Sequence, residues 1–164
     1  MHKVVVTDGL VLSKRGAGES NTLLALLTQE LGLVRASARS ARKEVSKLRF
    51  GLEPMTTARF SLVRGRNEWK LIGVEAVSRT LLSDSSLRRV QVGRVTRLLL
   101  RLIHGEEPVP ELYATIENGL RCLSETSDTL DAEAVECVLV LRILEHLGYL
   151  PGSPPLAPFL EGEV

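Results

Sequence analysis

Apolar and polar residues alternate in short runs through the first half of the chain, with the two-residue period of β-strands. Polar segments that contain glycine or asparagine, Gln29–Gly32 and Arg64–Glu68, separate neighbouring runs as turns do. Gly9 interrupts the first run, which suits a bulge in a sharply bent strand. The predicted strands are Lys3–Leu12, Thr22–Thr28, Leu33–Arg39, Met55–Val63 and Trp69–Val77.

These short strands and the lengths of their connections favour a small closed barrel. We expect a flexible basic loop at Lys14–Gly18 and a longer basic connection, Ser40–Arg49, between the third and fourth strands. The OB-fold is the commonest barrel of this description, although an SH3-like barrel gives a similar pattern. The pattern therefore predicts a five-stranded OB-fold barrel at the N-terminal end.

In the second half, apolar residues recur every three to four positions, as on the buried face of an α-helix. The start and stop signals predict helices from Leu87, after the capping segment Asp84–Ser86, to His104, with Gly105 as its stop; from Pro110; and from a cap at Thr129 or Asp131 to Gly148. The residues expected to face inward are Leu87, Val95, Leu98, Leu99, Leu102, Ile103, Leu112, Ile116, Leu120, Leu123, Val138, Leu141 and Leu144.

The two halves together predict an α+β protein, in which the OB-fold barrel precedes a small all-helical domain. We place the nucleic-acid-binding barrel at residues 1–79 and the helical domain at residues 80–151. Prolines interrupt the remainder and exclude further helix. Residues 152–164 are therefore expected to form an extended, proline-rich tail.

Charge divides along the same boundary. Residues 1–79 carry 14 Lys or Arg against 7 Asp or Glu, whereas residues 80–164 carry 7 against 13. From Leu102 onward there are 2 arginines and 12 carboxylates. Such an asymmetry points to a polyanionic partner for the basic half and supports two separate domains.

The cellular compartment can be inferred from what the chain carries. The start of the chain has no long apolar segment, so we expect no signal peptide, and the apolar stretches are too short to span a bilayer. Cys122 and Cys137 are not spaced like a metal pair, and we expect each to be a small buried hydrophobe without a disulfide. The sequence thus predicts a soluble, cytoplasmic protein.

Catalytic chemistry has little support. None of the three histidines, His2, His104 and His146, lies at metal-ligand spacing with a cysteine or carboxylate. His104 and His146 fall near helix ends, where a cation interacts favourably with the helix dipole. The chain contains neither a phosphate-binding Gly-x-x-x-x-Gly-Lys loop nor a nucleophile elbow. We expect no catalytic residue, no metal and no cofactor.

Basic residues are the stronger candidates for function. Loops that border one groove of a barrel can place cations against nucleic-acid phosphates, although a solvated basic loop is the alternative. Phe60 and Trp69 lie within predicted strands and should belong to the core, which leaves Phe50 as the candidate for base stacking. The predicted DNA-binding residues are Arg35, Arg39, Arg42, Lys43, Lys47, Arg49, Arg64 and Arg66.

A second basic cluster lies on the first predicted helix. Arg94, Arg97 and Arg101 share one side of that helix and border the apolar Leu98. Such a ridge could receive an acidic peptide that ends in a hydrophobic residue. It could equally form salt bridges with the carboxylates of neighbouring helices.

Several local patterns coincide, in order and spacing, with one family. Over roughly residues 3–151 the chain resembles the RecO family of bacterial recombination mediators. The last matching segment is similar to the family's Leu-Gly-Tyr-x-Pro pattern, which reads here Leu147-Gly148-Tyr149-Leu150-Pro151. The matching segments are Gly9–Leu12, Gly18–Leu24, Leu27–Ala36, Ala38–Lys43, Ser46–Arg49, Leu52–Met55 and Leu144–Pro151.

This resemblance implies an OB-fold followed by a helical domain, binding of single- and double-stranded DNA, and annealing of complementary strands. It implies work alongside RecR and contact with the acidic tail of single-stranded-DNA-binding protein, ending in the loading of RecA. The basic segment Arg35–Arg49 matches the family's DNA-binding region. No family residues carry over to the Arg94, Arg97 and Arg101 ridge.

The chain departs from the family in two respects. Many members have a four-cysteine zinc module after the Leu-Gly-Tyr-x-Pro pattern, but residues 152–164 contain no cysteine, so we expect no bound zinc. The chain also stops where members continue with further helices. A protein-interaction adaptor without intrinsic DNA binding is the alternative function, and an RNA-binding barrel gives the same pattern as a DNA-binding one.

Overall fold

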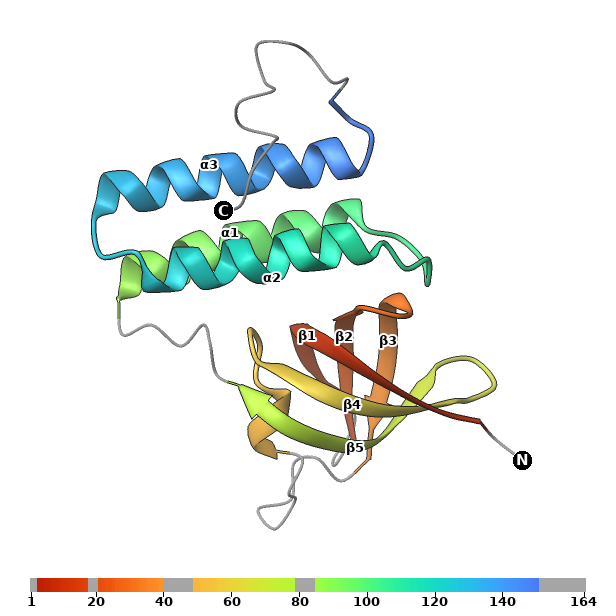
Figure 1. Cartoon of the computed structure of the whole chain (residues 1–164). Helices are drawn as coiled ribbons and strands as arrows, with labels where there is room; N and C mark the ends of the chain where they lie inside the picture. Colours follow the sequence, from red (N-terminus) through yellow and green to blue (C-terminus); the bar gives the residue numbers. More distant parts are fainter. Residues whose placement is uncertain (1–2, 18–20, 40–48, 79–84, 151–164) are drawn as a thin grey trace. The chain divides into compact units, whose positions relative to one another are not determined.

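The computed structural model describes residues 3–17, 21–39, 49–78 and 85–150. The chain divides into two compact units. One comprises Met1–Thr80 together with Ile103–Val109, and the other Leu81–Leu102 together with Pro110–Val164. The first unit contains the strands and the second the helices (Figure 1). The proposed tail at residues 152–164 lies outside the described residues.

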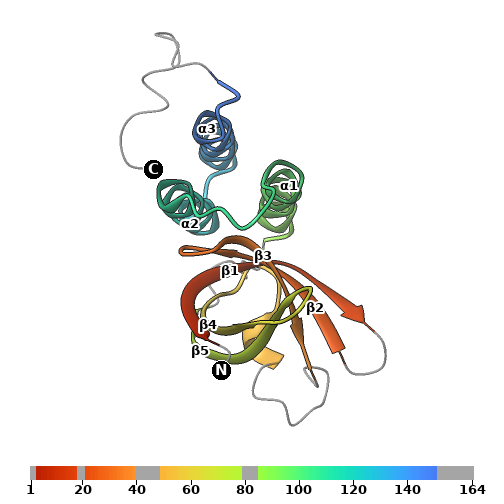
Figure 2. The same ribbon diagram turned by 90° about the vertical axis from the view of Figure 1, so that its right-hand side faces the viewer.

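The first unit is a closed barrel of strands in the order β1-β2-β3-β5-β4, which Figure 2 shows curving around a common centre. The β3–β5 pair is parallel and the other neighbouring pairs are antiparallel. This closed order confirms the OB-fold prediction and excludes the SH3-like alternative. The elements are β1 (Val4–Ala17), β2 (Asn21–Thr28), β3 (Gly32–Ala38), a short 3-10 helix (Arg49–Leu52), β4 (Thr57–Arg64) and β5 (Trp69–Ser78).

The first strand differs from its prediction in two ways. β1 continues through Lys14 and Arg15, which we expected in a flexible loop, because these residues pair with β2. The register shift lies between Val11 and Ser13 instead of at Gly9. Gly9 allows β1 and β2 to approach each other closely, since a β-carbon at this position would lie 3.0 Å from the Leu27 carbonyl oxygen.

Alternate residues of the strands fill the barrel. Phe60, Leu26, Leu62 and Val34 are almost completely buried, and Trp69 is 7% exposed. The expectation that Phe60 and Trp69 belong to the core is therefore confirmed. Neither ring is available to stack on a nucleic-acid base.

The second unit contains three helices, α1 (Ser86–Leu102), α2 (Pro110–Glu125) and α3 (Thr129–His146), seen nearly end-on in Figure 2. Pro110 begins α2 as predicted, and the inward residues predicted for this helix are all buried. The cap of α3 is Asp128, not Thr129 or Asp131, because its carboxylate accepts hydrogen bonds from the backbone N–H groups of Leu130 and Asp131.

The buried faces of α1 and α3 were only partly predicted. Leu87 is 41% exposed, and Leu98 and Leu102 are partly exposed, whereas Val95 and Leu99 are buried as expected. Ile103 is buried, but α1 ends at Leu102 instead of His104, and Ile103 belongs to the barrel unit. On α3, the predicted inward residues Val138, Leu141 and Leu144 are likewise partly exposed. The residues buried within these two helices are Arg88, Gln91, Val92, Val95, Thr96, Leu99, Ala132, Leu139, Arg142 and Ile143.

Arg88 explains the rotated face of α1. Its guanidinium donates to the carbonyl oxygens of Thr126 at 2.9 Å and Asp128 at 2.7 Å, and to the side-chain oxygen of Gln91 at 2.9 Å. These carbonyls belong to the connection between α2 and α3, where the end of a helix leaves acceptors unsatisfied. A buried arginine thus fastens the start of α1 to the α2–α3 turn.

Candidate nucleic-acid interface

The outer face of β1, β2, β3 and β5 presents two rows of aligned side chains. Arg15, Leu23, Ser37 and Lys70 form one row, because each pairs with its neighbour on the adjacent strand. Ser13, Ala25 and Arg35 form the next row in the same way. The middle of this face therefore carries small side chains, with Leu23 41% exposed between them.

Cations surround these small residues. Arg15, Arg35 and Lys70 are exposed on their strands, and Arg39 is exposed just after β3. Within the described residues, no hydrogen bond or ion pair engages these four side chains. We call Arg15, Arg35, Arg39 and Lys70 the strand-face cations. A strand face with small residues in its middle and cations around them suits an extended polyanion, since phosphates can approach the strands closely.

Two further cations of the barrel, Lys14 and Arg59, are already paired with carboxylates. Lys14 donates to Glu53 at 2.8 Å, and Arg59 holds both oxygens of Asp8 at 2.9 and 3.1 Å. This arginine lowers the pKa of Asp8 through its hydrogen bonds. Because Lys14 and Arg59 already pair with carboxylates, they are poorer candidates for phosphate contacts than the strand-face cations.

The predicted residues Arg64 and Arg66 lie at the connection between β4 and β5. Arg64 ends β4, forms an ion pair with Glu106, and places its guanidinium 5.1 Å from the centre of the Trp69 ring. The hydrogen bond from Arg64 is the main cause of a lowered pKa of Glu106. Arg66 is exposed in the loop that follows. Loops at this position and the face of β2 and β3 are where OB-folds bind oligonucleotides.

The remaining predicted DNA-binding residues fall where the structure gives no side-chain description. Arg42, Lys43 and Lys47 lie outside the described residues. Arg49 and Phe50 begin the 3-10 helix, but their side chains are also outside the description. Arg15 and Lys70 were not among the predicted residues. Arg15 was expected in a loop and Lys70 is a single cation in an apolar strand. Only the pairing of the strands shows that both lie on the same face as Arg35.

The three arginines of the ridge on α1 differ in their surroundings: Arg94 forms a salt bridge, whereas Arg97 and Arg101 are exposed to solvent. Arg94 holds the carboxylate of Glu136 on α3 at 2.7 and 2.6 Å, which is the salt-bridge interpretation. Arg97 and Arg101 are exposed, and in the part of the chain that the structure describes no side-chain partner engages them. Of the three arginines of this ridge, Arg97 and Arg101 therefore have no partner among the described residues.

Potential catalytic groups are scattered. The described residues contain no group of three or more His, Cys, Asp or Glu that could hold a metal. The imidazole Nε2 of His146 lies 3.0 Å from the hydroxyl of Thr115. Both cysteines are free thiols, but Cys122 is only half-buried and Cys137 is exposed, so the expectation that each is buried was wrong. Cys137 follows the exposed residues Glu133 and Ala134 by one turn of α3, so it lies on the solvent side of that helix.

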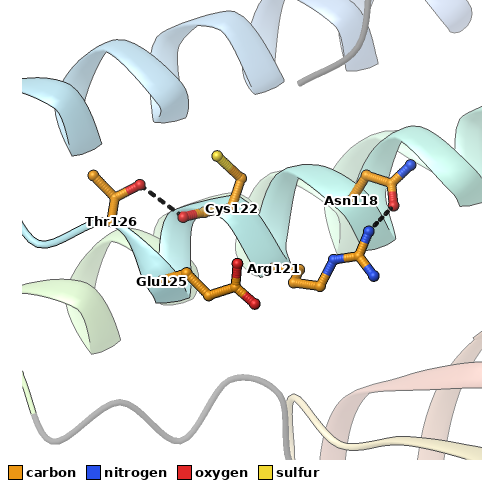
Figure 3. Close-up of a pocket in the computed structure, with 5 residues that line it drawn as sticks. All are labelled: Asn118, Arg121, Cys122, Glu125 and Thr126. Carbon is orange, nitrogen blue, oxygen red and sulfur yellow. Dashed lines mark hydrogen bonds between the residues drawn. The ribbon is translucent and has the colours of Figure 1, made fainter.

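An open hollow lies along the second half of α2. Figure 3 shows its lining residues, Asn118, Arg121, Cys122, Glu125 and Thr126. Arg121 donates to the side-chain oxygen of Asn118 at 2.7 Å, and the hydroxyl of Thr126 donates to the carbonyl oxygen of Cys122 at 2.7 Å. These polar groups satisfy one another and do not converge on a point where a ligand would sit.

Among the described helices, none is long and apolar enough to cross a membrane. Comparison with known proteins identifies the family. Residues 1–79 match the family described as recombination protein O N terminal, and residues 92–152 match recombination protein O C terminal. The chain belongs to the recombination protein O (RecO) family. The first match lies within the barrel unit, and the second covers most of the helical unit together with Ile103–Val109 of the barrel unit.

Curated RecO relatives cover most of the chain. It is 33% identical over 88% of its length to the DNA repair protein RecO of Heliobacterium modesticaldum. It is 31% identical over 91% of its length to the DNA repair protein RecO of Pelotomaculum thermopropionicum. It spans only 51% and 57% of these two relatives, respectively.

Proposed function

We propose that the barrel binds DNA through the strand-face cations and that the chain acts without catalysis in DNA repair and recombination. One observation carries the proposal: Arg15, Arg35 and Lys70 lie on the strand face that OB-folds use for oligonucleotides, and no carboxylate occupies them within the described chain. The relatives' name, DNA repair protein RecO, supports the same role.

The contacts would be mainly electrostatic. The described outer face carries no aromatic side chain near the strand-face cations, so affinity comes from phosphate neutralisation and the release of counterions. Such binding depends strongly on salt and weakly on base sequence. Two strands whose phosphates are neutralised repel each other less, which supports annealing of complementary single strands and binding of the resulting duplex. Arg42, Lys43, Lys47 and Arg49, whose side chains lie outside the described part of the chain, are proposed to add further phosphate contacts.

The partners that we propose follow the family. They are RecR, the acidic tail of single-stranded-DNA-binding protein, and indirectly RecA, which is loaded when the mediator acts. Arg97 and Arg101 supply the two unpaired cations for an acidic tail, and the partly exposed Leu98 beside them supplies an apolar contact. The proposed location of this activity is the cytoplasm.

Fluorescence anisotropy with a labelled single-stranded oligonucleotide, measured at several salt concentrations, tests the proposal. We expect log affinity to fall with log salt with a slope of about −0.7 for each neutralised phosphate. Three of the four strand-face cations replaced together by glutamine, Arg15→Gln, Arg35→Gln and Lys70→Gln, should lower the magnitude of the slope by about two units. Binding that is absent at low salt would exclude the DNA role.

An adaptor without DNA binding is the second candidate, and one observation favours it. Val4, Val6 and Ile72 are 48%, 50% and 54% exposed on the outer face of β1 and β5, where apolar side chains suit contact with a protein. Recovery of a protein partner that survives nuclease treatment, combined with no DNA binding, would support this role.

A further inference from the structure

Beside the proposed DNA-binding surface, the carboxylate of Glu106 forms an ion pair with Arg64. Arg64 ends β4, next to Val63, which pairs with the strand-face residue Lys70. Its guanidinium forms an ion pair with Glu106 and lies over Trp69. Arginine binds carboxylates and phosphates with the same hydrogen-bonding edge. Glu106 therefore stands where a nucleic-acid phosphate would otherwise be held.

The segment that carries Glu106 is part of the barrel unit although it connects α1 with α2 in the chain. Ile103 at its start is 8% exposed. The backbone of Glu107 packs against Gly32 at the β2–β3 turn so closely that no side chain would fit there. These contacts place Glu106 beside Arg64 and make the pairing a feature of the folded barrel.

The ion pair is accessible to a competing anion. The side chains of Arg64 and Glu106 are 53% and 41% exposed, respectively. Solvent-exposed ion pairs contribute little net stability, so a ligand can replace one partner at a small cost. Arg64 would keep its contact with the Trp69 ring while its guanidinium exchanges one anion for another.

We propose that Glu106 is an internal phosphate substitute that holds Arg64 in the free protein and is displaced by a DNA phosphate. The inference rests on the proposed DNA binding and adds a regulatory element to that surface. Glu106 lowers affinity for DNA, because each binding event must first break the pair. It also keeps a cation of the β4–β5 connection neutralised until a polyanion arrives.

Glu106→Gln removes the competing charge and keeps the size of the side chain. We expect it to bind single-stranded DNA about two- to five-fold more tightly than the wild type, the range that one exposed ion pair can supply. Glu107→Gln is the matched control. It changes the net charge equally, but the described structure gives the Glu107 side chain no ion pair, so its effect should stay below about 1.5-fold.

Arg64→Gln completes a double-mutant cycle. The substitution should weaken DNA binding more in the Glu106→Gln background than in the wild type, because only there is the full contact to phosphate lost. Additive effects of the two substitutions would overturn the proposal.

Trp69 gives a second readout, because it is the only tryptophan of the chain and lies under Arg64. Saturation with DNA should shift its emission in the wild type, and free Glu106→Gln should already be shifted in the same direction. If wild type and Glu106→Gln bind DNA equally and Trp69 does not respond, Glu106 has no such role although the DNA-binding function stands. If folded wild type binds no DNA at low salt, the proposed function itself fails.

Discussion

Glu107 and Gly32 are in closer backbone contact than any other residue type at position 32 would permit. A β-carbon on Gly32 would lie 2.8 Å from the carbonyl carbon and 2.9 Å from the nitrogen of Glu107. Gly32 also has a φ of +69°, in the left-handed region that favours glycine. We expect Gly32→Ala to lower the free energy of unfolding of the barrel by about 2–4 kcal/mol, because strain and overlap add. Urea denaturation followed by Trp69 fluorescence measures this.

Gly93→Ala is the matched control for Gly32→Ala, because a side chain at Gly93 would meet no neighbouring atoms. No atom outside its own helix neighbourhood lies within 4 Å of the place of its β-carbon on α1. Alanine should therefore stabilise the helical unit by about 0.5–1 kcal/mol through helix propensity. Circular dichroism during urea denaturation measures the change. Equal effects of the two substitutions would contradict the contact between Gly32 and Glu107.

The barrel could be predicted from the sequence more fully than the helical faces. Alternation identified β2 to β5 to within about two residues, because each strand has one face in the core. On α1, however, the buried face contains Arg88, Gln91 and Thr96, which a hydrophobic pattern assigns to solvent. Their burial depends on the carbonyl groups of the α2–α3 turn, and no local pattern reports those.

Arg88 provides a test of that explanation. Arg88→Ala removes three hydrogen bonds of a charged donor and leaves the carbonyl oxygens of Thr126 and Asp128 without it. We expect a loss of about 3 kcal/mol or more from the free energy of unfolding of the helical unit. Arg97→Ala on the exposed side of α1 should change it by less than about 0.5 kcal/mol. Thermal denaturation followed by circular dichroism distinguishes the two, and similar melting temperatures would refute the role of Arg88.

The pair of Asp8 and Arg59 predicts a weak pH dependence of barrel stability. Arg59 lowers the pKa of Asp8 in the folded state, so folding favours the ionised carboxylate. The resulting stabilisation is fully present above the unfolded pKa of about 3.9 and is lost as the pH falls through the lower folded value. Because both side chains are about half exposed, at 53% and 47%, the effect should be small.

Asp8→Asn provides the comparison. The melting temperature of the wild type should exceed that of Asp8→Asn by a nearly constant, small amount at neutral pH, and the difference should shrink below about pH 4. A difference that grows on acidification would have the wrong sign.

The candidate site was harder to predict than the fold, because it depends on which strands become neighbours. Ser37 and Lys70 are 33 positions apart in sequence and meet only through the parallel β3–β5 pair. Arg35 was predicted because it begins a dense basic run, whereas Lys70 stands alone between apolar residues. Arg64 was predicted as a free cation, but a carboxylate more than forty residues away pairs with it.

Single substitutions on the barrel should separate free from paired cations. Lys70→Gln and Arg35→Gln should each reduce the salt slope of DNA binding by about 0.7, since each removes one phosphate contact. Arg59→Gln removes the same charge, but Arg59 already forms hydrogen bonds with the carboxylate of Asp8. The salt slope of DNA binding for Arg59→Gln should therefore match that of the wild type. Anisotropy titrations of the three variants and the wild type decide the matter, and three equal slopes would show that charge alone, without position, governs binding.

The ridge on α1 allows a test of acidic-peptide binding, because Arg94 is paired with a carboxylate whereas Arg97 and Arg101 have no partner among the described residues. Arg97→Gln with Arg101→Gln should weaken binding of a synthetic acidic peptide that ends in an apolar residue by about two- to ten-fold. Glu136→Gln releases Arg94 from its carboxylate and should strengthen binding of the same peptide. Both effects should diminish at high salt, as expected for exposed charges. Tighter binding on loss of Arg97 and Arg101, or no response to Glu136→Gln, would assign acidic-peptide recognition to another surface.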